Sequence, residues 1–346
     1  MDHSRGQLPR SRGVRPRGEA HALADLRHRP LARRALLAAP ALLPFLAAPG
    51  CAAAPSAVSR PGEARITESR TVWRDAARAR DIPVLIREPA GSGPAPTVFI
   101  SHGLGGSREG LAYLGRALAE NGYLAIHLQH IGSDDSLWRG GGDRMVGLAA
   151  GALNVQAALD RLLDVKFALD NLPRRADPER LAVAGHSFGA WTVQHMLGER
   201  LPGGDRGLGL PDPRLKAGVA LSPIPAIGLP PRLAYGGFAV PMLHITGTED
   251  HGFIEGIRAP ARRAPFEQST NPGALVVLAG ALHASFADEQ EAGGRYAEST
   301  YHARAASLSV TFLDAVLRGD AADRAVLRNG ATGLLGPGDT FVSRGL

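Results

Sequence analysis

A serine flanked by glycines, in Gly185-His186-Ser187-Phe188-Gly189, is the feature of the sequence that most directly indicates chemistry. A serine hydroxyl becomes a nucleophile only when a base takes its proton and the backbone holds it clear of its surroundings. An apolar run, Leu181–Ala184, precedes the motif, and an apolar helical stretch follows it. At such a strand-to-helix turn, only residues without bulk fit two positions before and after the serine. The motif predicts a nucleophile at Ser187, with an ordinary glycine-rich turn as the alternative.

A second glycine-rich segment, Ser101-His102-Gly103-Leu104-Gly105-Gly106, directly follows the apolar run Thr97–Ser101. Acyl transfer needs two N–H donors aimed at the oxyanion of the tetrahedral intermediate. One donor is expected from Phe188, the residue after the nucleophile, and the other from this segment, where position favours Leu104. Alone, the segment is equally typical of a simple turn. Together with the serine motif it predicts an oxyanion hole.

An acid and a base are expected further along the chain, in the order serine, acid, histidine. The apolar run Met242–Thr246 is followed by Glu249 and Asp250, and the run Leu275–Leu278 is followed by His283. Asp250 is the predicted acid, with Glu249 as its competitor, and His283 is the predicted base. A loop-capping carboxylate and a surface histidine are the alternatives.

The other histidines near predicted strands do not indicate a second site. His251 shares the loop of the predicted acid and cannot easily reach across to the serine. By residue type, His127 and His130, followed by Asp134 and Asp135, could form a metal cluster. However, two rings at this spacing on and after a strand diverge, and no third ligand is spaced for zinc. The sequence predicts no metal and no other cofactor.

Strands and helices alternate around these residues. Most of the candidate strands are continuous apolar runs, which is typical of parallel strands buried on both faces. The candidate strands are Ile82–Ile86, Thr97–Ser101, Leu124–Leu128, Leu181–Ala184, Ala217–Leu221, Met242–Thr246 and Leu275–Leu278. The candidate helices are Ser107–Asn121, Asn154–Leu172, Gly189–Arg200 and Arg304–Leu317. The alternation predicts an open, mostly parallel, doubly wound sheet with helices on both faces. Together with the serine motif and the order of acid and base, it predicts an α/β-hydrolase fold.

Two stretches interrupt the alternation and are predicted to be loops. Gly132–Gly151 is rich in glycine and aspartate and contains Trp138, and Leu201–Pro213 is rich in glycine and proline. Loops at the carboxyl ends of the strands build the site in such a sheet. Trp138 is therefore a candidate substrate-binding wall, and a solvent loop with one packed aromatic side chain is the alternative.

Three separated motifs carry a family resemblance: Ser101-His102-Gly103-Leu104-Gly105, Gly185-His186-Ser187-Phe188-Gly189 and His283-Ala284-Ser285-Phe286-Ala287-Asp288. Together they resemble bacterial proteins labelled predicted dienelactone hydrolases, and they are similar to the platelet-activating-factor acetylhydrolases. The similarity runs from near Thr71 to Asp288. It implies a serine esterase with Ser187 as nucleophile and His283 as base.

Two departures from these families limit what the resemblance implies. True dienelactone hydrolases use a cysteine nucleophile, where this chain has Ser187. The acetylhydrolases take their acid just after the strand that is Ala217–Leu221 here, where this chain has Ser222 and no nearby carboxylate. Asp250, one strand later, matches the more common position, which bacterial polyester hydrolases share. The reaction class therefore carries over better than the substrate.

The net positive charge of the chain belongs to its first 54 residues. Nine arginines stand there against three acidic residues, which accounts for the whole formal charge of +6. The remainder is neutral, so no nucleic-acid partner is expected. Arg33-Arg34 precedes an apolar run, Ala35–Ala48, that is too short to span a bilayer. These features predict an export signal that resembles a twin-arginine signal, and a disordered basic arm is the alternative.

The only cysteine, Cys51, follows this apolar run, so no intrachain disulfide can form. Its surroundings match a lipid-attachment site weakly, and we weigh a lipid anchor against an unmodified or discarded cysteine. The chain has 346 residues, 44% of them apolar, which suits one such domain plus a leader. The predicted organisation is an export signal (1–54), a linker (55–70), an α/β-hydrolase domain (71–320) and a C-terminal tail (321–346).

The sequence as a whole predicts an exported serine hydrolase that cleaves carboxylic esters of small molecules or lipids. Its expected location is periplasmic or extracellular, either free or as a membrane-anchored lipoprotein. A lipase, a polyester hydrolase, a phospholipid acetylhydrolase or an amidase on the same residues is an alternative. A non-catalytic binding protein that keeps the fold is another.

Overall fold

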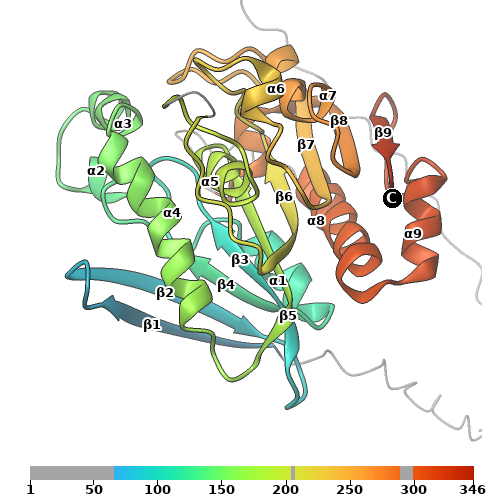
Figure 1. Ribbon diagram of the computed structural model, residues 1–346, viewed down its shortest axis with the longest axis horizontal. Coiled ribbons are helices and arrows are strands. Elements are labelled where there is room, and N and C mark those ends of the chain that lie inside the picture. The colour runs from blue at the N-terminus through green and yellow to red at the C-terminus, as the bar shows by residue number, and fades with distance from the viewer. Residues whose placement is uncertain (1–65, 204–206, 289–298) are drawn as a thin grey trace, which may run out of the picture. The chain divides into compact units, whose positions relative to one another are not determined.

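The computed structural model describes residues 66–203, 207–288 and 299–346 (Figure 1). The predicted export signal, Cys51 and residues 55–65 of the predicted linker lie outside the described residues. Within the described ranges, no helix combines the length and the apolar character that crossing a membrane requires.

The described strands form one nine-stranded sheet in the order β1-β2-β4-β3-β5-β6-β7-β8-β9. Neighbours from β4 through β8 pair in parallel, whereas β1–β2, β2–β4 and β8–β9 pair antiparallel. The prediction of a mostly parallel sheet is confirmed. The strands are β1 (Thr67–Asp75), β2 (Arg80–Glu88), β3 (Ala95–Ser101), β4 (Leu124–Leu128), β5 (Ala176–His186), β6 (Leu215–Leu221), β7 (Met242–Glu249), β8 (Gly273–Leu282) and β9 (Thr340–Arg344).

Helices cover both faces of this sheet, and short helical turns join some of its strands (Figure 1). The α-helices are α1 (Ala112–Glu120), α2 (Ser136–Arg139), α3 (Arg144–Ala152), α4 (Val155–Asp170), α5 (Phe188–Met196), α6 (Pro231–Ala234), α7 (Ala264–Glu267), α8 (Ser299–Leu313) and α9 (Ala321–Arg328). The short turns are η1 (Ala259–Arg263), η2 (His283–Phe286) and η3 (Asp314–Arg318).

Two hydrophobic clusters lie on opposite faces of the sheet because successive side chains of a strand point to opposite sides. In β3, Val98 belongs to the cluster that contains Leu114 of α1 and Phe312 of α8. Its neighbour Phe99 belongs to the cluster that contains Leu162 of α4. The central strands are therefore buried on both faces, which explains their continuous apolar runs.

All seven predicted strands and all four predicted helices are present, Leu124–Leu128 with the predicted ends and the others with shifted ends, but the folded region exceeds the predicted boundaries. β1 begins at Thr67, inside the predicted linker. The predicted tail forms α9, whose Leu327 is fully buried in a core cluster, and β9, which pairs with β8. Both β1 and β9 are edge strands; most residues of β1 are exposed, and no residue of β9 is fully buried. They lack a continuous apolar run for that reason.

The predicted loop 132–151 also differs from the structure, since it contains α2 and α3. α3 begins after Asp143, whose carboxylate accepts hydrogen bonds from the amides of Met145 and Val146 at 2.8 and 3.2 Å. This cap satisfies amides that the first helical turn leaves unpaired.

Candidate active site

The three predicted catalytic side chains come from separate segments at one edge of the sheet. Ser187 follows β5, Asp250 follows β7 and His283 follows β8, and these strands run parallel. The carboxyl ends of parallel strands meet at the same edge, where loops form sites. The structure brings the three side chains together. His283 Nε2 lies 3.0 Å from Ser187 Oγ, and His283 Nδ1 lies 2.7 Å from Asp250 Oδ1.

The hydrogen bonds define the tautomer of His283. An ionised carboxylate only accepts hydrogen bonds, so the Nδ1–H of His283 donates to Asp250. Nε2 is then left to accept the proton of the Ser187 hydroxyl. Asp250 is fully buried, and burial alone raises the pKa of its carboxyl group. The hydrogen bond from His283, the charge of Arg262 and the hydrogen bond from Thr246 outweigh burial and lower that pKa to about 2.

Ser187 lies on a backbone turn that the glycines of its motif make possible. Its φ of 55° and ψ of −114° fall in a region that non-glycine residues rarely adopt. A Cβ at Gly185 would lie 2.5 Å from the backbone carbonyl carbon of Gly189. A Cβ at Gly189 would lie 1.9 Å from the carbonyl oxygen of Ser101. Neither position has room for a side chain, which agrees with the expected strand-to-helix turn.

Asp250 and its competitor Glu249 differ in their surroundings. The Glu249 side chain is 57% exposed and lies 3.8 Å from His251. Asp250 points inward, where Thr246 Oγ1 donates to its Oδ2 at 2.7 Å. The alternative acid position after β6 holds Ser222, whose buried hydroxyl has no hydrogen-bond partner among the described residues. The structure thus places Asp250 within hydrogen-bond distance of His283 Nδ1.

Two residues that we did not single out in the sequence border this group. Arg262 is fully buried, with Nε 2.9 Å from Asp250 Oδ1. Its Nη2 donates at 2.9 Å to Glu255 Oε1, which lies 3.9 Å from His283 Nε2. Arg262 lies in the short turn η1 among several arginines, so no motif or periodicity distinguished it from its exposed neighbours.

The loop after β3 is folded by its own hydrogen bonds. His102 Nδ1 donates to the Gly103 carbonyl at 2.6 Å, and the Gly105 amide donates to the Ser133 carbonyl at 2.9 Å. The amides of Leu104 and of Phe188, the two predicted oxyanion donors, meet no acceptor among the described residues. Phe188 opens α5, where the first amides of a helix have no intrahelical partner.

A cavity of about 520 Å³ opens over Ser187 and His283, and we call it the main cavity. Leu104 lies in its wall, and the 92% exposed side chain of Phe253 lies at its rim. Most of its lining side chains are apolar. The apolar lining residues are Leu104, Leu111, Met145, Leu148, Phe253, Ile254, Ala284 and Ala287, and the charged ones include Arg144, Glu255 and Asp288.

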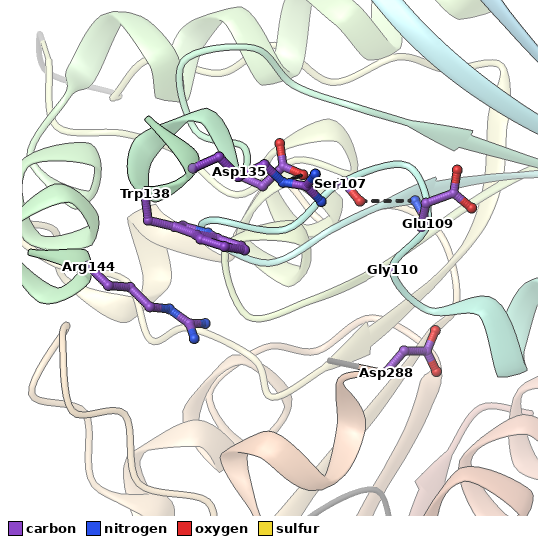
Figure 2. Close-up of a pocket in the computed structure, with 8 residues that line it drawn as sticks. Ser107, Glu109, Gly110, Asp135, Trp138, Arg144 and Asp288 are labelled. Atoms are coloured by element: carbon purple, nitrogen blue, oxygen red, sulfur yellow. Dashed lines mark hydrogen bonds and ion pairs between the residues drawn. The ribbon is translucent and has the colours of Figure 1, made fainter. Parts of the chain in front are cut away.

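A side cavity of about 330 Å³ adjoins the main cavity and shares Gly110, Arg144 and Asp288 with it. Figure 2 shows Trp138 in its wall, with the guanidinium of Arg144 extending toward the space between Trp138 and Asp288. Trp138 does not line the main cavity. Its Nε1 donates to the Gly105 carbonyl at 2.9 Å. The predicted substrate-binding wall therefore contacts the loop after β3 and borders the side cavity.

The two histidines that suggested a metal cluster belong to separate hydrogen-bond networks. His127 contacts Arg87 Nη1 at 2.6 Å and the Gly110 carbonyl at 3.0 Å. His130 contacts Ser101 Oγ and Asp164 Oδ2, each at 3.0 Å. In the part of the chain that the structure describes, no three His, Cys, Asp or Glu side chains are arranged to hold a metal ion.

No protein-family model and no curated protein matches this chain. Among solved structures, a ferulic acid esterase from Streptomyces cinnamoneus superposes with a TM-score of 0.56. The match has 20% sequence identity and covers 76% of this chain and 93% of that chain. At this sequence identity the match shows a shared fold, and a fold alone does not define an activity. The chain has the α/β-hydrolase fold, as we predicted from its sequence.

Proposed function

We propose that this protein is a serine hydrolase that cleaves carboxylic esters through an acyl-enzyme on Ser187. The observation that carries the proposal is the hydrogen-bond chain from Asp250 through His283 to the Ser187 hydroxyl. The serine stands at a strained strand-to-helix turn beside two unpaired backbone amides. This combination provides a nucleophile, a base, an orienting acid and oxyanion donors.

The mechanism follows from these positions. His283 Nε2 takes the hydroxyl proton as Ser187 Oγ attacks the ester carbonyl carbon, and Asp250 stabilises the imidazolium that forms. The amides of Leu104 and Phe188 bind the oxyanion of the tetrahedral intermediate. His283 then returns the proton to the leaving alkoxide, which departs as an alcohol. Water attacks the acyl-enzyme by the same route and releases the carboxylic acid.

The proposed substrate is a small-molecule or lipid ester. The apolar wall of the main cavity suits an apolar acyl or alcohol group. The choice of an ester over an amide is our proposal by analogy with the ferulic acid esterase that has a similar fold. The resemblance to dienelactone hydrolases and to platelet-activating-factor acetylhydrolases rests on three motifs and stays a prediction.

A second candidate is a hydrolase of insoluble apolar esters, either lipids or polyesters. Phe253 at the rim of the main cavity is 92% exposed, and Met145, which also lines that cavity, is 55% exposed. Exposed apolar side chains around a cleft favour contact with an apolar surface. Activity on such a surface would use the same Ser187 chemistry.

The substrate class is tested by a panel of p-nitrophenyl esters from acetate to palmitate, a matched p-nitroanilide and a polyester film. We expect saturable ester hydrolysis and little anilide hydrolysis, with Ser187→Ala as the control. Long-chain preference or release of product from the film selects the second candidate. Preference for the anilide would contradict the esterase assignment, and a protein that turns over nothing would be the non-catalytic alternative.

We further propose that the protein is exported and that residues 1–54 are its signal. Support comes from the arginine-rich stretch and the apolar run Ala35–Ala48. Mass spectrometry of the mature N-terminus from the native host tests this proposal. We expect the chain to begin near residue 52–56, or at a lipid-modified Cys51. Cytoplasmic protein that keeps Asp2 would contradict it.

A further inference from the structure

One buried arginine makes contacts on both sides of the proposed oxyanion hole. Arg161 of α4 is fully buried, and all of its hydrogen bonds go to uncharged oxygens. Its Nε donates to Thr192 Oγ1 at 3.0 Å, and its Nη1 donates to Ser133 Oγ at 2.9 Å. Its Nη2 donates to Ser101 Oγ at 2.9 Å and also to the His102 carbonyl.

These contacts join the two segments that carry the predicted oxyanion donors. Ser101 is the last residue of β3, and His102 begins the loop that carries the Leu104 amide. On the other side, the guanidinium carbon lies 4.5 Å from the centre of the Phe188 ring. Thr192 Oγ1 accepts from Arg161 and donates at 3.0 Å to the Phe188 carbonyl. One planar group thus contacts the end of β3 and the first turn of α5 together.

The contact with Ser101 is continued by a second row of serine, histidine and aspartate. Ser101 Oγ accepts from Arg161 and has its own proton for His130 Nε2, while His130 Nδ1 donates to Asp164. Burial and the charge of Arg161 lower the pKa of His130 to about 4, so its ring is neutral at pH 7. Ser101, His130 and Asp164 are fully buried and line neither cavity. The row therefore supports Arg161 and its loop and does not meet a substrate.

A lysine could not replace this arginine. A guanidinium has five N–H donors in a fixed plane, whereas an ammonium has three donors around one point. The buried positive charge is compensated by Asp164 and Asp134, which oppose the lowering of the pKa of Arg161 by burial. Burial outweighs these charges and lowers the pKa of Arg161 to about 9, so the guanidinium is still charged at neutral pH.

From these contacts we infer that Arg161 is a positioning residue for the oxyanion hole. It holds the amides of Leu104 and Phe188 at the mutual spacing that the tetrahedral intermediate requires. The inference rests on the proposed function and deepens it. Misplacement of a catalytic group by about 1 Å can cost about 10²-fold in rate, and each oxyanion donor is worth about 10²–10³-fold.

The test is Arg161→Lys in the full chain, with steady-state kinetics on p-nitrophenyl butyrate and on its thionoester. We expect kcat for the ester to fall by about 10²-fold while KM changes by less than about threefold. The thiocarbonyl sulfur accepts hydrogen bonds poorly, so it gains less from the oxyanion hole. We therefore expect a clearly smaller loss on the thionoester. Binding of a boronic acid, which forms a tetrahedral adduct on the serine, should weaken in proportion to kcat.

Two further variants make the test decisive. Arg344→Lys is the matched control, because Arg344 of β9 likewise donates to uncharged oxygens, here two carbonyls and a serine hydroxyl, and lies over an aromatic ring, that of Phe266. It should keep wild-type kinetics. Ser101→Ala removes one contact between Arg161 and the loop with little change in volume. Ser101→Ala should lose less kcat than Arg161→Lys, again with a larger loss on the ester than on the thionoester. It decides the question if Arg161→Lys does not fold.

The outcomes separate this inference from the proposed function. If Arg161→Lys folds and keeps the kcat of the wild type, the inference is overturned. If Arg161→Lys does not fold, an unchanged kcat in Ser101→Ala overturns it. In either case the esterase activity of the wild-type protein still supports the proposed function. If kcat falls equally on the ester and the thionoester, and the fraction of active sites counted by titration of Ser187 falls with it, Arg161 has a merely structural role. This result would also overturn the inference. A wild-type protein without esterase activity would overturn the proposed function, and the inference with it.

Discussion

Asp250 and Arg262 form a fully buried ion pair, with Arg262 Nε 2.9 Å from Asp250 Oδ1. The same carboxylate oxygen accepts the hydrogen bond from His283 Nδ1 at 2.7 Å. Arg262 thus helps to keep the acid ionised, and Asp250 provides the charge that lets the arginine be buried. The acid consequently serves both the proposed chemistry and the folding of the loop around it.

This pair predicts that Asp250→Asn loses both activity and stability. Without the charge that orients and stabilises His283, kcat should fall by up to about 10⁴-fold. Arg262 would lose its ion pair with Asp250 and keep Glu255 as its charged partner, so the unfolding free energy should fall by at most about 3–5 kcal/mol. We would measure kcat on a short-chain ester, under conditions in which the variant is folded, and the unfolding free energy by urea denaturation.

Glu249→Gln is the matched control, since Glu249 is the adjacent carboxylate and its side chain is 57% exposed. It should change both quantities only slightly. If Glu249→Gln were the crippled variant, or if Asp250→Asn kept more than a tenth of wild-type kcat, the acid would have to be sought elsewhere.

A second buried carboxyl group, Glu199, predicts the pH dependence of stability. Burial raises the pKa of Glu199 to about 8, against the opposing hydrogen bond from Gln194. Between its ordinary pKa of 4.5 and this value, the folded state holds a proton that the unfolded chain has released. Unfolding free energy therefore falls as pH rises through this window, by up to about 1.4 kcal/mol per unit.

Glu199→Gln, which mimics the protonated acid, should remove this loss. The variant should match the wild type near pH 4 and exceed it in melting temperature at pH 8. Thermal unfolding of both proteins across this range provides the measurement. Parallel pH profiles for the two proteins would show that Glu199 does not carry the effect.

The turn at Ser187 predicts strong sensitivity to one methyl group. In Gly189→Ala, the new Cβ would lie 1.9 Å from the Ser101 carbonyl oxygen, so the turn and the end of β3 must move apart. We expect loss of more than about 10²-fold in kcat or failure to fold. Gly93→Ala is the control, because a Cβ at Gly93 meets nothing within 4 Å. Wild-type activity in Gly189→Ala would contradict the described turn.

The sequence was sufficient for the central strands and for the order of the three site residues. Continuous apolar runs mark strands buried on both faces, and each site residue follows such a run at one sheet edge. β1 and β9 escaped prediction because edge strands need no continuous apolar run; polar residues interrupt both segments. Arg161 and Arg262 escaped it because burial of an arginine depends on distant acceptors that no local pattern reveals.

Trp138 illustrates a further limit of sequence reasoning. A loop aromatic near a predicted site is as compatible with a substrate wall as with a structural role. Its hydrogen bond to the Gly105 carbonyl and its place beside the side cavity emerge only from the fold of α2 and the loop after β3. The local sequence contains no signal for that contact.

The central claim, a nucleophilic Ser187, is tested most directly by a fluorophosphonate probe followed by peptide mass spectrometry. We predict one phosphonyl adduct per chain, on the peptide that contains Ser187. Ser187→Ala should lose both the adduct and ester hydrolysis, by several orders of magnitude, while its melting temperature stays unchanged. An adduct on another residue, or a Ser187→Ala variant that keeps a tenth of the wild-type rate, would contradict the account.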